Sequence, residues 1–405
     1  MAIVAFVALL ARGTAFLLLG GSSHLVVLES DHVATRLLSG QGMTLQYLGV
    51  TYHAYMSPLP PLLVAGIYLL SGQSQTAVVA FQALTGVALA VSTAFLGRAM
   101  FDARTGLLAG LLLAIHPGIG YYDVHDVQPF SVGLLPTILC VAAFWHLVHR
   151  PWDKRWWGVP GIAIGLAILL RGSLLAFLVI ALAWLLVRRI PWRAVLGVAC
   201  LSAVAMAIIV GPWLVRNWVV IGRPVFLSTQ NMLLWVGNNP NASGGWLDSQ
   251  GRDMLAVASP ELKQRLSEQS DELGQSDVFR QNLDAYVLSH PGEVLRRDVL
   301  KAVYLWTWSP YLGQTYPPGL QVPYDAFNVL TGLLALAGAV IAWRRRGQLR
   351  WACELILLFA LSETALRALT YVEGRHRWEI EVVTYLLTAF ALTSVVVRRS
   401  TPARA

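Results

Sequence analysis

The feature that most constrains the fold is a series of long apolar segments separated by short loops that carry positive charges. A transmembrane helix needs about 20 mostly apolar residues, so the shorter of these segments must extend into their flanking loops. Only 13% of the residues are charged and the mean hydropathy is +0.58, whereas soluble domains carry about 25% charged residues. The sequence therefore predicts an all-α polytopic membrane protein with about ten transmembrane helices. The apolar windows cover residues 2–20, 76–96, 105–118, 129–148, 158–170, 172–187, 194–212, 325–343, 351–370 and 378–396.

The positive residues occupy alternate loops, which is the pattern of loops on the cytoplasmic side of a membrane. With the N-terminus inside, every inner loop is basic, so the net charge of +8 is an insertion signal rather than a sign of nucleic-acid binding. The first apolar window lacks a cleavage site with small residues and is predicted to be a retained helix. We expect a multi-pass protein of the plasma (bacterial inner) membrane. The basic residues of the predicted inner loops and tail are Arg98, Arg104, Arg150, Lys154, Arg155, Arg188, Arg189, Arg193, Arg344, Arg345, Arg346, Arg350, Arg398 and Arg399.

This topology requires the segment Pro60–Leu70 to stay on one side. It has too few apolar residues to span a bilayer, and its double proline favours a re-entrant or interfacial helix. Residues 1–212 then form an N-terminal transmembrane module with outer loops 21–75 and 118–128. Residues 213–324 form an extracytoplasmic segment with interfacial helices, and residues 325–405 hold the C-terminal transmembrane helices. The three cysteines lie in apolar segments and indicate no disulfide or metal spacing.

The two outer loops of the first module carry the acidic candidates. Glu29 and Asp31 follow the first apolar window, where a carboxylate can accept a proton from an attacking hydroxyl or hold a divalent cation. The second loop has a polar and acidic patch. Asp31 and Asp126, one from each loop, are the candidates to share a metal ion. Each acid is equally compatible with a solvated loop. The patch consists of Asp123, His125, Asp126 and Gln128.

Basic residues near the outer face are the candidates for binding a phosphate. Arg171 lies between two apolar segments, where a charge is expensive and indicates function, although snorkelling to lipid headgroups is the alternative. Arg375 and Arg377 lie in a short outer loop, where the insertion rule disfavours positive charge. Two further predictions are structural. Glu363 and Arg367, four residues apart on one helix, are expected to pair, and Arg12 is expected to face either a cavity or an acidic partner.

The order of these motifs resembles the GT-C superfamily of polyprenyl-phosphate-sugar-dependent glycosyltransferases, and in particular protein mannosyltransferases and lipid A aminoarabinose transferases. The matching pieces are ESDHVATRLLSG, PLPPLLVAGIYLLSG, the LLRG turn at Arg171, GPWLVRNWVVIGRPVFLSTQNMLLWVGNNPNASGG and GRHRWEIE. They span nearly the whole chain. One departure is Gln128, which stands where family members often have an acid.

The resemblance implies transfer of a sugar from a polyprenyl phosphate to an acceptor on the extracytoplasmic face, with inversion. It implies that the first-loop acid, Asp31, is essential, and we expect Asp31 to act as the base or to orient the acceptor hydroxyl. It also implies that Arg171, Arg375 and Arg377 contact the lipid phosphate. The aromatic residues Tyr52, Tyr55 and Tyr122 are candidates to contact the sugar or lipid. A divalent cation is compatible with this reading, and no nucleotide cofactor is expected. The expected partners are the lipid-linked donor, membrane lipids and a glycan, lipid or protein acceptor.

Two other classes stay open from the sequence: a transporter or flippase of a lipid-linked sugar, and a non-catalytic partner in envelope assembly. The chain shows no inverted repeats or paired broken helices, which transporters often have. Gln128 in place of an acid keeps the non-catalytic reading open. The sequence does not specify the sugar, the acceptor, the prenyl chain length, the metal requirement or the oligomeric state.

Overall fold

The computed structural model describes residues 1–171, 174–307 and 318–399. Its secondary structure is predominantly helical, as the sequence predicts, and every predicted apolar window coincides with a helix. These bundle helices are α1 (Ala2–Leu18), α4 (Gln75–Met100), α5 (Ala103–Ala114), α7 (Phe130–His149), α8 (Val159–Leu170), α9 (Leu175–Val187), α10 (Trp192–Ile221), α15 (Pro318–Trp343), α16 (Gln348–Leu369) and α17 (Trp378–Arg399).

The helices vary in length, and this affects the count of membrane spans. Among the described residues, five helices are long and apolar enough to cross a membrane: α4, α7, α10, α15 and the segment Gly374–Val395. A sixth span forms if α5 and α6 (Pro117–His125), which bend by 47° at a short break, act as one. The chain is therefore a multi-pass membrane protein, while the predicted total of ten spans is not confirmed.

The bundle is closely packed where small residues let helices approach. A Cβ added at Gly106 of α5 would overlap the Ala94 carbonyl of α4, and one at Gly110 would meet the Ala94 side chain. Small residues at such contacts are typical of membrane helices, because the backbones gain van der Waals contact. The C-terminal helix α17 packs on α15, α5 and α7. Helices from both ends of the chain thus share one core.

The first outer loop folds into short elements on top of this bundle. It contains a 3-10 turn, η1 (Gly21–His24), and the helices α2 (Glu29–Leu38) and α3 (Leu59–Ser71), which pack together. Strand β1 (Val26–Val27) pairs in parallel with β4 (Asp126–Val127) of the second outer loop, with Val26 opposite Asp126. Strands β2 (Leu45–Tyr47) and β3 (Val50–Tyr52) form a hairpin. The two outer loops are thereby joined directly.

The long segment after α10 has its own small core. Its helices are α11 (Gln230–Gly237), α12 (Pro260–Ser267), α13 (Glu272–Ser289) and α14 (Pro291–Trp306). Buried residues of α11 to α13 pack together, with Tyr47 and Tyr371 at the edge of the cluster. The predicted boundary at residue 212 falls inside α10. The 3-10 turns η2 (Lys154–Trp156) and η3 (Gly374–Arg377) complete the elements.

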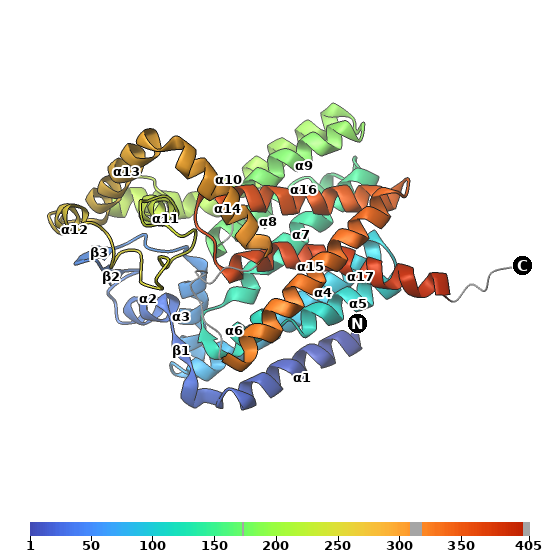
Figure 1. The fold of residues 1–405 in the computed structure, drawn as a ribbon, viewed down its shortest axis with the longest axis horizontal. Helices are drawn as coiled ribbons and strands as arrows, with labels where there is room; N and C mark the ends of the chain where they lie inside the picture. The colour runs from blue at the N-terminus through green and yellow to red at the C-terminus, as the bar shows by residue number, and fades with distance from the viewer. Residues whose placement is uncertain (172–173, 308–317, 400–405) are drawn as a thin grey trace, which may run out of the picture.

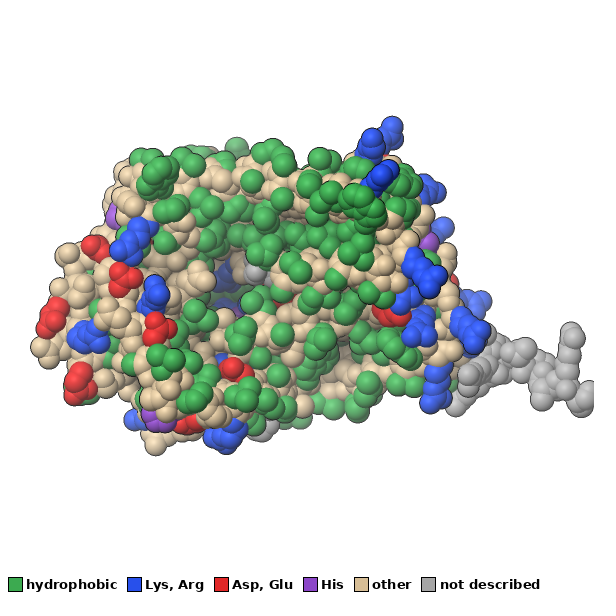
Figure 2. All heavy atoms as spheres, turned by 90° about the horizontal axis from the view of Figure 1, so that it is seen from above, with side chains coloured by type: hydrophobic (Ala, Val, Ile, Leu, Met, Phe, Trp, Pro, Cys, Tyr) green, Lys and Arg blue, Asp and Glu red, His purple; other side chains and the backbone are tan. Residues whose placement is uncertain are grey.

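Charge is distributed unevenly along the molecule. Figure 1 shows the start of α1 and the end of α17 near one end, and α11 to α13 at the other. Figure 2 shows many Lys and Arg side chains at the first of these ends, and most of the visible Asp and Glu side chains at the other. A band of hydrophobic side chains lies between them and is hollowed in the middle, with basic side chains visible inside the hollow. The grouping of basic residues agrees with the predicted arrangement of inner loops.

Candidate functional site

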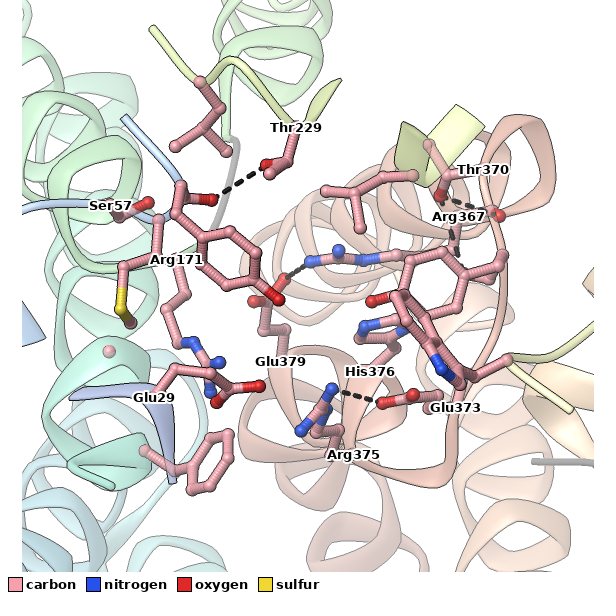
Figure 3. A pocket seen from close by; sticks show the side chains of 18 of the residues that line it. Glu29, Ser57, Arg171, Thr229, Arg367, Thr370, Glu373, Arg375, His376 and Glu379 are labelled. Carbon is pink, nitrogen blue, oxygen red and sulfur yellow. Dashed lines mark hydrogen bonds and ion pairs between the residues drawn. The ribbon is translucent and has the colours of Figure 1, made fainter. Parts of the chain in front are cut away.

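A cavity of about 490 Å³ lies where the outer loops, α11 and the turn before α17 meet. Its charged lining residues come from three separate parts of the chain: α2, the α8 end and the α16–α17 connection. Aromatic and hydroxyl side chains from the first outer loop and the α11 region complete the wall (Figure 3). The charged lining residues are Glu29, Arg171, Arg367, Glu373, Arg375 and Glu379.

Two arginines approach one aromatic ring in this cavity. The guanidinium carbon of Arg171 lies 4.5 Å from the centre of the Phe130 ring, and that of Arg375 lies 5.5 Å from the same centre. Arg171 makes no side-chain hydrogen bond or ion pair with the described residues. Burial, with repulsion from Arg375, lowers the pKa of Arg171 to about 10. Arg171 is thus still a cation at neutral pH, and a bound anion would relieve the repulsion.

Glu29 and Asp31 point to different environments. Glu29 is the first residue of α2 and lines the cavity, where Figure 3 shows its carboxylate beside Arg171. The helix N-terminus favours the carboxylate charge. Asp31 is only 8% exposed, and its carboxylate accepts a short hydrogen bond from the Tyr68 hydroxyl of α3. Of the two predicted catalytic acids, Glu29 is therefore the one that lines the cavity.

The connection from α16 to α17 supplies most of the cavity's charge. Arg375 pairs with Glu373 at 2.5 Å, and Arg367 pairs with Glu379 at 2.6 Å. The predicted partner of Arg367 was Glu363, one helical turn away, so this prediction is wrong. Tertiary packing brings Glu379 from α17 to Arg367. Both ion pairs are internally neutral, whereas Arg171 and Glu29, which lie beside each other, form no side-chain ion pair with the described residues.

Aromatic side chains also line the cavity. Tyr47 and Tyr55 contact each other edge to face at 5.1 Å, and Trp246 contacts Tyr371 at 5.5 Å. Burial, aided by Asp253, raises the pKa of Tyr47 to about 12, and burial aided by Glu373 raises that of Tyr371 to about 12. Their hydroxyls therefore stay protonated at neutral pH and can donate hydrogen bonds.

The acidic patch of the second loop lies outside the cavity. Asp123 is fully buried and pairs with Arg12 of α1 at 2.8 Å, which identifies the partner of that arginine as an acid. Asp126 is bonded to His125 Nδ1 at 2.6 Å. Gln128 accepts a hydrogen bond from the Ser30 backbone N–H at 3.2 Å, so it joins the second loop to the start of α2.

The predicted metal ligands do not form a complete ligand set. In the described part of the chain, no group of three or more His, Cys, Asp or Glu side chains is placed to hold a metal ion. Asp31 and Asp126 are each buried and already bonded, to Tyr68 and His125 respectively. The carboxylates of Asp31 and Asp126 therefore do not fit a cation held by the protein.

Of the remaining predicted site residues, Tyr55 is in the cavity lining, and the others lie outside it. Arg377 pairs with Glu381 at 2.9 Å and donates to the Thr307 carbonyl, so it lies outside the cavity lining. Tyr52 and Tyr122 are each 2% exposed. Tyr55 lines the cavity. Tyr122 packs edge to face on Phe130 and Trp378, at 4.9 and 4.7 Å.

Several residues that line the cavity were not among the predicted site residues. Trp246, Thr229 and Met232 come from the long segment after α10, where no local pattern indicates which side chain reaches the membrane module. Glu373 and Tyr371 carried a usable signal, because they flank the basic turn that the insertion rule singles out.

Part of the chain matches a known protein family. Residues 54–215 match the family model of dolichyl-phosphate-mannose-protein mannosyltransferases. No curated protein matches the chain by sequence at a significant level.

Solved structures show the same fold. The oligosaccharyltransferase AglB from Archaeoglobus fulgidus, in complex with an inhibitory peptide and a dolichol-phosphate, aligns with a TM-score of 0.56 at 14% identity, over 100% of this chain and 52% of that one. The same organism's enzyme with Zn and sulfate gives 0.57 at 15% identity, over 98% and 49%. ArnT from Cupriavidus metallidurans bound to undecaprenyl phosphate aligns at 17% identity over 99% of this chain and 81% of that one, with a TM-score of 0.46.

The chain spans about half the length of the archaeal structures that it matches. Identities this low establish the fold rather than a shared substrate. The family match over residues 54–215 supports the resemblance predicted from the sequence, and this chain is a multi-pass membrane protein with the fold of the archaeal oligosaccharyltransferase AglB.

Proposed function

We propose that this protein is a glycosyltransferase that moves a sugar from a polyprenyl phosphate to an acceptor hydroxyl on the extracytoplasmic face of the membrane. One observation carries the proposal. A carboxylate, Glu29, and two arginines on a single ring, Arg171 and Arg375, line the same cavity. This combination suits a reaction in which an acid activates a nucleophile and cations stabilise a departing phosphate.

The phosphate of the donor is assigned to Arg171 and Arg375. Arg171 is a cation without an ion pair among the described residues, in a partly buried site where a guanidinium can bind phosphate in a bidentate manner. Arg375 adds a second cation, although Glu373 already neutralises part of its charge. The hollow in the apolar band supports this assignment, because a prenyl tail can stay in the bilayer while its phosphate reaches basic side chains (Figure 2).

Glu29 is the proposed general base. The acceptor hydroxyl gives its proton to Glu29 while its oxygen forms a bond with the anomeric carbon. The bond from that carbon to the phosphate oxygen breaks, and polyprenyl phosphate leaves with the electron pair. Attack opposite the leaving group inverts the anomeric configuration. Asp31, bonded to Tyr68, is proposed to orient α2 against α3.

The aromatic wall is proposed to hold the acceptor or the transferred sugar. Tyr47, Tyr55 and Trp246 offer flat faces, and the hydroxyls of Ser57 and Thr229 are close by in the same lining. Aromatic faces with adjacent hydroxyls suit a sugar ring, which has apolar C–H faces and a polar edge. A glycan, a lipid or a protein acceptor is compatible with this wall.

Transfer from a panel of radiolabelled polyprenyl-phosphate sugars tests the proposal, with purified protein in native membrane lipids. We expect Glu29→Gln to lose turnover and keep donor binding, and Arg171→Ala to lose donor binding. Glu261→Gln, an exposed acid on α12, is the matched control and should behave like the parent protein. Donor that is moved across vesicles without any transfer would instead identify a transporter. Absence of both donor binding and transfer would favour a non-catalytic role.

A further inference from the structure

Two buried charged side chains of α13 and α14 reach the two sides of the cavity. The first wall is defined by Tyr55, Ser57 and Thr229, and the second wall by Thr370, Tyr371 and Arg375. Glu272 begins α13 and is 2% exposed, whereas Lys301 lies in α14 and is fully buried. Neither side chain lines the cavity itself, and Lys301 also forms an ion pair with Asp298 of α14 at 2.8 Å.

Glu272 binds the backbone that leads into the first wall. Its Oε1 accepts a hydrogen bond from the His53 N–H at 2.9 Å, and its Oε2 accepts one from the Ala54 N–H at 3.1 Å. The Ser228 hydroxyl donates to Oε2 at 2.5 Å. A buried carboxylate is stable only with such partners, and all three donors belong to segments other than α13.

These bonds continue directly into the cavity lining. The Ser228 N–H donates to the Ala54 carbonyl at 3.0 Å, and the Thr229 hydroxyl donates to the Tyr55 carbonyl at 2.8 Å. Tyr55 and Thr229 both line the cavity, and Figure 3 shows the Thr229 bond. Glu272 thus holds two neighbouring backbone segments, one at residues 53–54 and one at Ser228. The residues that follow these segments, Tyr55 and Thr229, belong to the first wall.

Lys301 binds the backbone of the loop that forms the second wall. Its ammonium donates to the Thr370 carbonyl at 2.8 Å and to Asn238 Oδ1 at 3.0 Å. Asn238 Nδ2 donates to the Leu369 carbonyl at 3.0 Å. A Cβ on Gly237 would overlap the Thr370 carbonyl oxygen, so the end of α11 lies directly against this loop. The loop then continues to Tyr371 and Arg375.

We propose that Glu272 and Lys301 are positioning residues that set the separation of the two walls through the continuous α13–α14 unit. The segment after α10 would then act as a spacer, placing the aromatic wall opposite the proposed phosphate site. The role of this spacing in catalysis rests on the proposed glycosyl transfer. The linkage itself, meaning the hydrogen bonds that join α13 and α14 to the two walls, does not. Neither residue touches a substrate in this arrangement.

Hydrogen exchange tests the linkage without any activity assay. In Glu272→Gln we expect exchange at the His53 and Ala54 amides to rise about tenfold or more, because a charge-assisted acceptor is lost. In Lys301→Met we expect faster exchange in residues 369–372 and unchanged exchange at residues 53–54. The control variants are Asp277→Asn, whose partner Arg223 is exposed, and Arg296→Met on the exposed side of α14. Exchange equal to these controls would overturn the inference.

Milder variants keep the test decisive if a buried change prevents folding. Ser228→Ala removes one donor to Glu272, and Asn238→Ala removes one tie to Leu369. Each should loosen only its own wall. In transfer assays, the Glu272 and Ser228 variants should raise the acceptor KM, and the Lys301 and Asn238 variants should weaken donor binding. If the parent protein transfers no sugar, the proposed function fails while the exchange pattern still decides the linkage. Local exchange changes with unaltered KM and donor binding would overturn the positioning role.

Discussion

Arg171 and Arg375 approach the same Phe130 ring from different parts of the chain, at 4.5 and 5.5 Å from its centre. Two like charges this close to one ring repel each other. Arg375 is paired with Glu373, whereas Arg171, which has Glu29 beside it, makes no side-chain ion pair with the described residues. A phosphate is the kind of ligand that would bridge them.

Arg171→Ala should weaken binding of the lipid phosphate about 10- to 100-fold, which is the range for losing a charged hydrogen bond. Arg171→Lys should recover only part of this, because an ammonium cannot bind phosphate in a bidentate manner. Titration of undecaprenyl phosphate into detergent-solubilised protein measures the effect. Arg223→Ala, an exposed arginine at the surface, is the control. Unchanged affinity in Arg171→Ala would refute the assignment.

Glu29→Gln should lower kcat about 100- to 10,000-fold, the range for loss of a general base. The KM values should change little, because the amide has nearly the same size as the carboxylate. Single-turnover transfer with saturating donor provides the measurement. A similar loss in Asp31→Asn together with normal turnover in Glu29→Gln would move the base to Asp31.

The ion pair between Arg12 and Asp123 should be essential for stability. Both side chains are 1% exposed, and removing one partner leaves a buried charge without compensation. We expect Arg12→Met to cost about 3–5 kcal/mol, and the double variant with Asp123→Leu to recover a large part of it. Thermal unfolding in detergent measures both. Additive losses in the double variant would show that the two residues are not coupled.

Acidification should loosen the turn that carries Trp246. Hydrogen bonds from the Arg252 and Gln250 backbone N–H groups, together with the Arg252 side chain, lower the pKa of Asp248 below its ordinary 3.8. Because the pKa of Asp248 is lower in the folded protein than in the unfolded chain, its carboxylate stabilises the fold fully at pH values above the ordinary pKa of 3.8. This stabilisation is lost as the pH falls through the lowered pKa of the folded state. Trp246 fluorescence, followed from about pH 6 to about pH 2, should report the change. Asp248→Asn should abolish this pH dependence.

The sequence predicted the helices well because apolar periodicity and charge placement are local. It predicted Arg171 and Arg375 because charges near a bilayer are rare for an energetic reason. It favoured Asp31 as the base, whereas Glu29 is the acid that lines the cavity. Two residues apart on a helix differ by about 200° in direction, so only one of them faces a given cavity, and the direction depends on how α2 packs against α3.

Tertiary contacts explain the other differences. Glu363 lies one turn from Arg367, and this spacing favours a pair in an isolated helix. In the folded protein, α17 presents Glu379 to Arg367 at 2.6 Å. Likewise, Asp123 has the position of a loop acid in the sequence, but α6 extends the bundle and directs it to Arg12. Such long-range pairings have no signature in a single sequence.

The parallel pairing of β1 with β4 restricts how the chain threads through the membrane. Val26 and Val27 lie directly beside Asp126 and Val127, so both points are on one side of the bilayer. The chain between them must then cross an even number of times. Helix α4 supplies one crossing, and the bent pair α5–α6, taken as a single span, supplies the return. On that count α3 does not cross, and the turn between α4 and α5, with Arg98 and Arg104, lies on the opposite side.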